Sequence, residues 1–148
     1  MKENLDFWQK KLKPIPSNIL DNILKPIIEE ETLKIDCTSC GNCCKAMQPA
    51  LDQINAKNAA NQLSISENQF YAKYGEYDPI NKVHFIKSNP CAFLRENRCS
   101  IYSNRPESCR DFPHLSKPHF KYRIRKIVAN AAICPIIENT LTRLNTIV

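Results

Sequence analysis

Apolar residues near the start of the chain recur at the spacing of one helix face. Six of them fall within residues 17–31: Ile19, Leu20, Ile23, Leu24, Ile27 and Ile28. This pattern predicts an amphipathic helix whose stripe belongs to the core. Ser17 can cap the helix, and Pro26 should kink or divide it, because proline lacks an N–H and its ring clashes with the preceding turn. A shorter helix over residues 5–12 should precede it.

Three short segments with regular patterns occupy the middle of the chain. Residues 52–63 are typical of a helix, with Asp52 near its start. Residues 66–69 read Ser-Glu-Asn-Gln, which fits a capping box and predicts a second short helix running through Tyr74. Residues 83–86 read Val-His-Phe-Ile and predict a strand.

The second half of the chain predicts a hairpin and a last helix. Residues 91–94 and 99–102 flank a polar turn at 95–98, which indicates a hairpin with a cysteine on each arm. Pro135 suits the first turn of the last helix. The inner face of that helix should carry five residues: Ile136, Ile137, Thr140, Leu141 and Leu144.

A basic stretch at residues 117–126 interleaves charged side chains with apolar ones. It contains five cations: Lys117, Lys121, Arg123, Arg125 and Lys126. The alternation from Phe120 through Tyr122 to Ile124 predicts a strand with one charged face, and lysines protect such an edge from pairing with other chains. Bases could also stack on these aromatic rings while lysines follow the phosphates. We favour the solvated edge strand, so a nucleic-acid partner is disfavoured.

The cysteines are the residues that best indicate the chemistry of this chain. There are eight of them: Cys37, Cys40, Cys43, Cys44, Cys91, Cys99, Cys109 and Cys134. Thiolates spaced Cys-x2-Cys can point at one soft metal ion, because the intervening turn brings both sulfurs to one side. The triple Cys37, Cys40 and Cys43 also matches the first three ligands of the bacterial iron–sulfur run. We therefore favour metal binding over disulfides or buried structural thiols.

The adjacent pair Cys43-Cys44 needs separate treatment. Neighbouring side chains diverge on a helix and on a strand, so the two sulfurs should rarely bind one ion. Either the pair serves two centres, or one thiol binds metal and the other is a spare, reactive group. The residues alone leave both arrangements open.

Composition narrows the class of protein. The chain of 148 residues has two glycines, whereas a phosphate-binding loop or a dinucleotide fingerprint needs several, which excludes both designs. The formal net charge of +6 counts every cysteine as neutral, so thiolates around a metal would lower it, and basicity is weak evidence for nucleic-acid binding.

We find no secretory signal and no apolar run near the roughly 18 residues of a membrane span. We expect a cytoplasmic protein, whose thiols stay reduced.

The cysteines and their neighbours resemble those of a known family. The resemblance rests on Cys-x2-Cys-Gly-x-Cys-Cys at 37–44, Cys-x-Phe-Leu at 91–94, Cys-x-Ile-Tyr at 99–102, Arg-Pro-x2-Cys-Arg-x-Phe-Pro at 105–113 and Cys-Pro at 134–135. This order is similar to that of the CxxCxxCC, or YkgJ-type, cysteine-cluster proteins, over residues 37 to 144. Those proteins are described as zinc- or iron-chelating domains. A larger relative, the flagellin lysine methylase, carries a similar region and depends on iron–sulfur chemistry.

The resemblance implies that all eight cysteines are candidate metal ligands, without assigning them to individual ions. Arg105 and Arg110 lie where the family motif has arginines. A guanidinium there could donate to a thiolate and lower the charge of the site, or it could pair with Glu107 or Asp111.

The three histidines are scattered along the chain, and none forms a pair at helical ligand spacing. His114 and His119 lie near Cys109 and could supply a nitrogen ligand. We expect surface or packing roles for both of them and for His84.

These patterns predict a small, mainly helical α+β single domain with a short hairpin, stapled by cysteine-ligated metal. Residues 1–36 should form an N-terminal helical extension, and residues 37–148 a cysteine-cluster metal-binding domain. The cofactor should be an iron–sulfur cluster or zinc, with iron slightly favoured by the x2-x2 triple. Two alternatives stay open: a redox or group-transfer enzyme that uses such a cluster, and a zinc-stapled adaptor for protein or nucleic acid.

Overall fold

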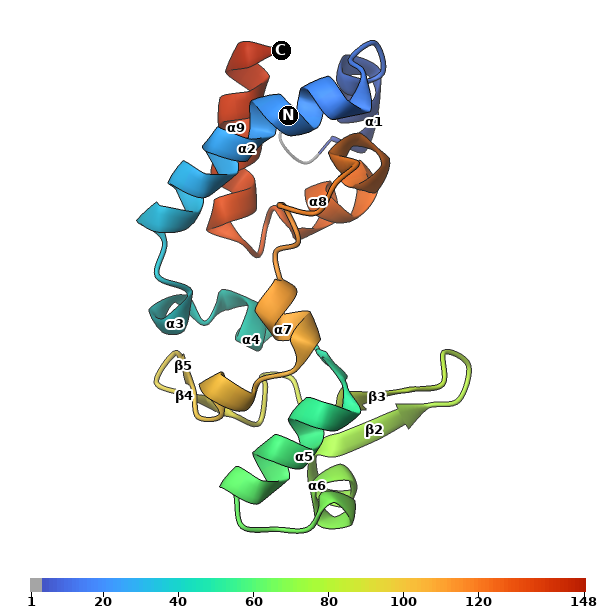
Figure 1. Ribbon diagram of the computed structural model, residues 1–148, viewed down its shortest axis with the longest axis vertical. Coiled ribbons are helices and arrows are strands. Elements are labelled where there is room, and N and C mark those ends of the chain that lie inside the picture. Colours follow the sequence, from blue (N-terminus) through green and yellow to red (C-terminus); the bar gives the residue numbers. More distant parts are fainter. Residues whose placement is uncertain (1–3) are drawn as a thin grey trace. The chain divides into compact units, whose positions relative to one another are not determined.

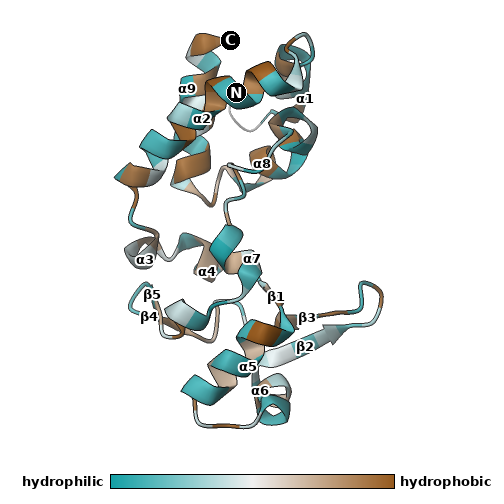
Figure 2. Ribbon diagram, in the orientation of Figure 1, coloured by the Kyte–Doolittle hydropathy of each residue, from teal (hydrophilic) through white to brown (hydrophobic). Residues whose placement is uncertain are grey.

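Only part of the apolar stripe near the start of the chain is buried, and Ile19, which was expected in it, is 47% exposed. In the computed structural model, which describes residues 4–148, α2 (Ser17–Lys34) packs along α9 (Pro135–Ile147) (Figure 1). The buried apolar side chains of α2 are Leu20, Leu24 and Ile27. All five residues expected on the inner face of α9 are buried, which confirms that prediction. The hydropathy colouring shows brown segments alternating with teal ones along both helices (Figure 2).

Two details of α2 differ from the prediction. The helix begins at Ser17 with Pro16 as its N-cap, so Ser17 is the first helical residue and its side chain caps nothing. The helix then continues through Pro26 to Lys34 without being divided. Proline removes only one hydrogen bond there, and burial of the stripe on either side of Pro26 stabilises the rest of the helix.

The remaining helices of this part pack around the same core. They are α1 (Leu5–Leu12), the 3-10 helix η2 (Phe120–Arg123) and α8 (Ile124–Asn130). The prediction of α1 is confirmed, and its Trp8 and Leu12 are buried. Met1–Asp36 and Pro113–Val148 together form one compact unit, which we call the helical unit.

The prediction of a strand within residues 117–126 is wrong. Phe120 and Ile124 lie four residues apart, and both are buried because one face of the η2–α8 segment packs on the core. Tyr122, between them, points outward and is 74% exposed. Apolar residues at i and i+4 fit helical spacing as well as strand alternation, and over five residues the two patterns cannot be separated.

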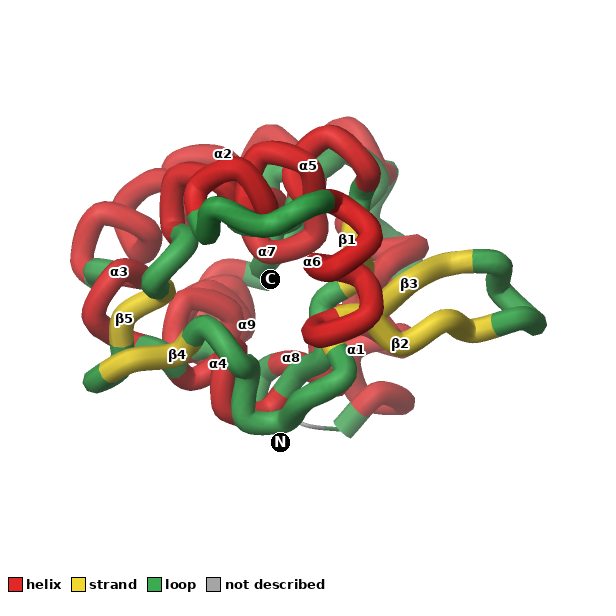
Figure 3. Tube along the Cα trace, turned by 90° about the horizontal axis from the view of Figure 1, so that it is seen from below, coloured by secondary structure: helices red, strands yellow, loops and turns green. Residues whose placement is uncertain are grey.

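Cys37–Phe112 form the second compact unit, which we call the cysteine unit. Its sheet has three short antiparallel strands in the order β1–β3–β2: β1 (Ala50–Leu51), β2 (Gly75–Asp78) and β3 (Val83–Ile86). The predicted strand at 83–86 is thus confirmed as the central one. The β2–β3 hairpin extends away from the helices of the unit (Figures 1 and 3).

Two helices cover the core of the cysteine unit, and both begin as predicted. The side chain of Asp52 caps α5 (Gln53–Gln62) by accepting from the Asn55 N–H. The capping box of Ser66 and Gln69 is present at the start of α6 (Glu67–Tyr74). Beneath these helices, Phe70 stacks on Phe93 with ring centroids 5.9 Å apart.

The shortest elements carry most of the cysteines. They are α3 (Cys37–Cys40), α4 (Asn42–Ala46), the hairpin strands β4 (Leu94–Arg95) and β5 (Arg98–Cys99), the 3-10 helix η1 (Tyr102–Asn104) and α7 (Glu107–Asp111). The hairpin is where the sequence predicts it, but its strands are only two residues long, so Cys91 precedes the first arm. Glu96 and Asn97 at its tip both have positive φ, as a type I′ turn requires.

The fold class is as predicted. Helices account for 59% of the chain and the strands are few, short and antiparallel, which makes it a mainly helical α+β protein. Among the helices within residues 4–148, none combines the length and apolar character needed to cross a bilayer.

Candidate metal centre

Gly41 holds the first cysteine run against the turn of the β4–β5 hairpin. It separates α3 from α4 with φ +67°, a conformation that costs glycine little and other residues much. A Cβ at this position would lie 3.1 Å from both the Cα and the carbonyl oxygen of Asn97. The backbone N–H of Cys91 donates to the carbonyl of Cys44 over 2.8 Å. The run is therefore fixed against the hairpin by backbone contacts.

Cys91 and Cys99 occupy similar environments on either side of the hairpin. Cys99 pairs with Leu94 across the two strands. Burial raises the pKa of both thiols, while backbone N–H groups that donate to the sulfurs act in the opposite direction. For Cys91 these donors are Phe93 and Leu94, and for Cys99 the donor is Ile101. N–H donors directed at sulfur are a common environment of metal-bound thiolates.

Cys109 lies on α7, which is fastened to the rest of the cysteine unit at its first turn. The Ser108 hydroxyl donates to the Ala50 carbonyl over 2.9 Å, and the Glu107 N–H donates to the second carboxylate oxygen of Asp52 over 2.8 Å. Burial raises the pKa of Cys109 to about 12, with the charges of the neighbouring thiols as further causes. Asp52 therefore caps α5 and also holds the helix that carries Cys109.

Four thiols of the cysteine unit form one electrostatic group: Cys43, Cys91, Cys99 and Cys109. The charge on Cys43 raises the pKa of the other three thiols, Cys91 acts on Cys99 and Cys109, and Cys99 acts on Cys109. Every pair among the four is thus close enough to interact. Cys43 lies on α4, Cys91 just before the β4–β5 hairpin, Cys99 on β5 and Cys109 on α7.

The four thiols do not yet surround a single point. Within residues 4–148, no three Cys, His, Asp or Glu side chains are already arranged as ligands of one ion. The donor set itself fits a soft metal, because it consists of half-buried thiols, and sulfur is a soft ligand. Binding would require the thiols to deprotonate and their side chains to turn inward.

Cys43 and Cys44 contact each other rather than diverging. The Cys44 thiol donates to the Cys43 sulfur, and this bond is the main reason why the pKa of Cys43 falls to about 6. The same bond, with burial and the charges of Cys91 and Cys99, raises the pKa of Cys44. The hydrogen bond between the two side chains therefore favours loss of the first proton from the pair and opposes loss of the second.

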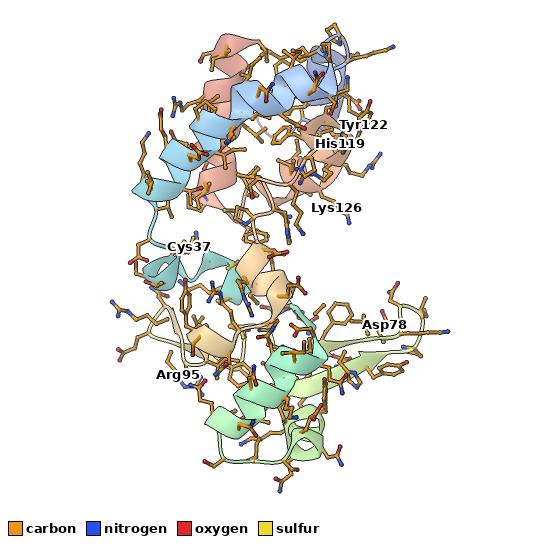
Figure 4. All side chains as sticks on the ribbon, viewed as in Figure 1. Cys37, Asp78, Arg95, His119, Tyr122 and Lys126 are labelled. Carbon is orange, nitrogen blue, oxygen red and sulfur yellow. The ribbon has the colours of Figure 1, made fainter. Side chains whose placement is uncertain are left out.

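Two arginines bring positive charge to this group of thiols. Arg105 stacks on Tyr102, 3.9 Å from the ring centroid, and its charge opposes the effect of burial on the pKa of Cys99. Arg95 acts in the same way on Cys91. Arg95 was not among the predicted site residues, although it lies in the polar turn between two cysteines. Arg95 is labelled in Figure 4, in the same unit as Cys37.

Arg110 joins α7 to neighbouring segments of the cysteine unit by hydrogen bonds. Its guanidinium donates to the Asn55 side-chain oxygen over 2.7 Å and to the Arg105 carbonyl over 3.3 Å. These bonds tie α7 to the start of α5, where Asp52 makes its own contacts. Arg110 thus positions the segment on which Cys109 lies.

Helix α3, which carries two further candidate cysteines, contacts β5, the strand that ends with Cys99. Cys37 is exposed and Cys40 partly buried on α3, whereas Cys134 is buried as the N-cap of α9 in the helical unit. His84 packs between Tyr71 and Tyr77, with ring centroids 4.6 and 4.8 Å away.

The other two histidines belong to the helical unit. The His119 ring lies 3.4 Å from the Ser17 hydroxyl. The carbonyl of His114 accepts from Arg123 over 2.6 Å.

Comparison with known proteins gives one match. The family model CxxCxxCC, described as "Putative zinc- or iron-chelating domain", matches residues 36–135. Neither the curated proteins nor the solved structures contain a significant match to the chain.

Proposed function

Because the chain belongs to the CxxCxxCC family of zinc- or iron-chelating domains, we propose that Cys43, Cys91, Cys99 and Cys109 hold one metal centre. The family supports a metal-binding function for the chain. The observation that carries this choice of ligands is the electrostatic coupling of every pair among the four thiols. Four thiolates are the ligand set of structural zinc sites and of cubane iron–sulfur clusters.

The surroundings of the four thiols favour a charged thiolate centre. Four thiolates around a dication have a formal charge of about −2, and burying it uncompensated would be costly. Arg95 and Arg105 supply opposite charge next to Cys91 and Cys99, and backbone N–H groups donate to both sulfurs. Such outer contacts orient ligands and adjust the properties of the bound metal.

We propose that Cys44 acts on the centre through Cys43. Its thiol donates to the Cys43 sulfur, so it would stay protonated while Cys43 binds. This arrangement would give the adjacent cysteines different roles without a second ion. Cys37, Cys40 and Cys134 are candidate ligands outside this set of four.

We favour an iron–sulfur cluster over zinc. Backbone N–H groups donate to the sulfurs of Cys91 and Cys99, and such hydrogen bonds are a means by which proteins adjust cluster potential. A closed tetrathiolate site would suit zinc equally well. The cluster, when bound, would supply one-electron redox chemistry or a rigid staple for the cysteine unit.

The test is metal analysis on protein purified without oxygen. An iron–sulfur centre should give brown protein that absorbs broadly near roughly 400 nm and contains iron with acid-labile sulfide. Colourless protein with one zinc per chain would overturn the preference for iron while keeping the metal site. Protein without bound metal, which also fails to bind added zinc or reconstituted iron and sulfide, would overturn the proposed function itself.

A further inference from the structure

Most of the basic stretch at residues 117–126 lies in the η2–α8 segment and not on an edge strand. On an edge strand, the lysines would protect the unpaired edge from pairing with other chains. The structure has no strand at these residues, and the apolar residues Phe120 and Ile124 face the core instead. Tyr122 and the neighbouring cations are therefore outside, on a folded surface that the metal centre does not use.

Four outward side chains line up along this segment. His119 and Tyr122 are three residues apart at the 3-10 helix, where such side chains eclipse, and their ring centroids are 6.2 Å apart. Arg125 and Lys126 follow three and four residues after Tyr122 on α8, so they lie on the same face. All four are exposed. His119, Tyr122 and Lys126 appear on the same flank of the helical unit in Figure 4.

Hydrogen bonds of three side chains hold the backbone beneath this stripe. The Asp21 carboxylate accepts from the N–H groups of His119 and Phe120 over 2.7 and 3.0 Å. The Lys121 ammonium donates to the Ile15 carbonyl over 2.6 Å, and the Arg123 guanidinium donates to the His114 carbonyl over 2.6 Å. A surface fixed in this way loses little conformational entropy when a ligand binds.

These contacts also decide which cations face solvent. Lys121 and Arg123 are engaged with carbonyl groups, and Asp21 lies close enough to Arg123 to affect its pKa. Arg125 and Lys126 make no such bonds within the part of the chain that the structure describes. From residue 113 to 137 the sequence contains no Asp or Glu. The stripe is therefore a positive surface with an exposed aromatic ring at its centre.

We infer that this stripe, His119–Tyr122–Arg125–Lys126, is a binding surface for single-stranded nucleic acid. Tyr122 offers an exposed face on which a base can stack, and Arg125 and Lys126 lie within one helical turn of it to contact the adjoining phosphates. Duplex would fit less well, because its bases are already stacked and cannot reach the ring. An acidic protein surface would use the charges but not the aromatic face.

The test measures binding of the full-length, metal-loaded protein to a fluorescent oligodeoxythymidylate of about 12 nucleotides by fluorescence anisotropy. Tyr122→Ala should weaken binding roughly fivefold or more. The double variant Arg125→Glu/Lys126→Glu should weaken it further and reduce the slope of log K against log salt by about 1.4, if each cation contacts one phosphate. Circular dichroism and the thermal midpoint should show that both variants remain folded.

Matched controls come from exposed positions of the cysteine unit. Tyr77→Ala removes a tyrosine that is 53% exposed, and Lys57→Glu/Lys82→Glu makes the same change in net charge. Both controls should bind within about twofold of wild type. The inference is overturned if wild type fails to bind, or if the controls lose as much affinity as the stripe variants. Equal binding of a duplex, or equal displacement by polyglutamate and by unlabelled oligonucleotide, would also overturn it. None of these results depends on which metal the cysteine unit holds.

Discussion

Asp52 is expected to connect the stability of the cysteine unit to its metal centre. One carboxylate oxygen caps α5 by accepting from the Asn55 N–H over 2.9 Å, and the other accepts from the Glu107 N–H at the start of α7 over 2.8 Å. Cys109 lies on α7. The side chain thus joins two helices that are far apart in sequence, one of which carries a proposed ligand.

Asp52→Asn isolates the second of these bonds. Asparagine is as good an N-cap as aspartate, so α5 should keep its cap. The Glu107 N–H, however, would lose a charged acceptor, and such hydrogen bonds are worth about 1.5–3 kcal/mol. Because Asp52 is only partly buried, we expect the lower end of that range, about 1.5 kcal/mol. Asp52→Ala removes the cap as well and should cost about 1 kcal/mol more.

Urea denaturation of both variants at fixed metal loading, with release of metal to a chelator measured in parallel, provides the test. Asp52→Asn should lower the midpoint and speed metal release, because α7 is held less firmly. Asp78→Asn is the matched control, since Asp78 accepts from the Ile80 and Asn81 N–H groups within one exposed hairpin turn. Its midpoint should stay close to that of wild type. Identical midpoints and release rates for Asp52→Asn and Asp78→Asn would refute the argument.

The pH dependence of the Asp52→Asn effect follows from the same bonds. Burial raises the pKa of Asp52, but the N–H groups of Glu107 and Asn55 outweigh it and lower the pKa below its usual value. A depressed carboxyl pKa contributes stability that is complete above the unfolded value, near about 4, and that is lost as the pH falls through the folded value. The difference between wild type and Asp52→Asn should therefore be constant from pH 7 to about 5 and shrink in more acidic solution.

Two further predictions concern the first cysteine run. Cys43→Ser should lose the proposed metal centre, whereas Cys44→Ser should keep it, because serine can still donate to the Cys43 thiolate. The measurement is the metal content per chain. Loss of metal in Cys44→Ser but not in Cys43→Ser would contradict the proposed roles. Gly41→Ala should destabilise the protein by roughly 2–4 kcal/mol, since a positive φ and a Cβ 3.1 Å from the backbone of Asn97 both oppose it. Asn42→Ala, at the exposed next residue, should change the urea midpoint little, and an equal loss in both variants would show that the close approach is unimportant.

Local features of the sequence were sufficient for most helix boundaries. The capping sites at Asp52 and Ser66 and the proline at the start of α9 act over three or four residues, so they can be recognised without knowing the fold. The inner face of α9 was predictable for the same reason, because thirteen residues contain several periods of the helical pattern. Failures occurred where the pattern was short. Five residues around Tyr122 fit a strand and a helix alike, and packing of Phe120 and Ile124 decided between them.

The spacing of the cysteines determined that this chain has the chemistry of a soft-metal site, but not which thiols meet. The run at 37–44 implied a centre built on the x2-x2 triple, because only neighbours in sequence can be grouped by spacing. In the tertiary structure Cys43 also lies within electrostatic reach of Cys91, Cys99 and Cys109, which Gly41, the hairpin turn and α7 position. It also brings Arg95 beside Cys91 and turns the Cys44 thiol toward Cys43. Contacts between residues about 50 positions apart depend on the whole fold, and no local pattern encodes them.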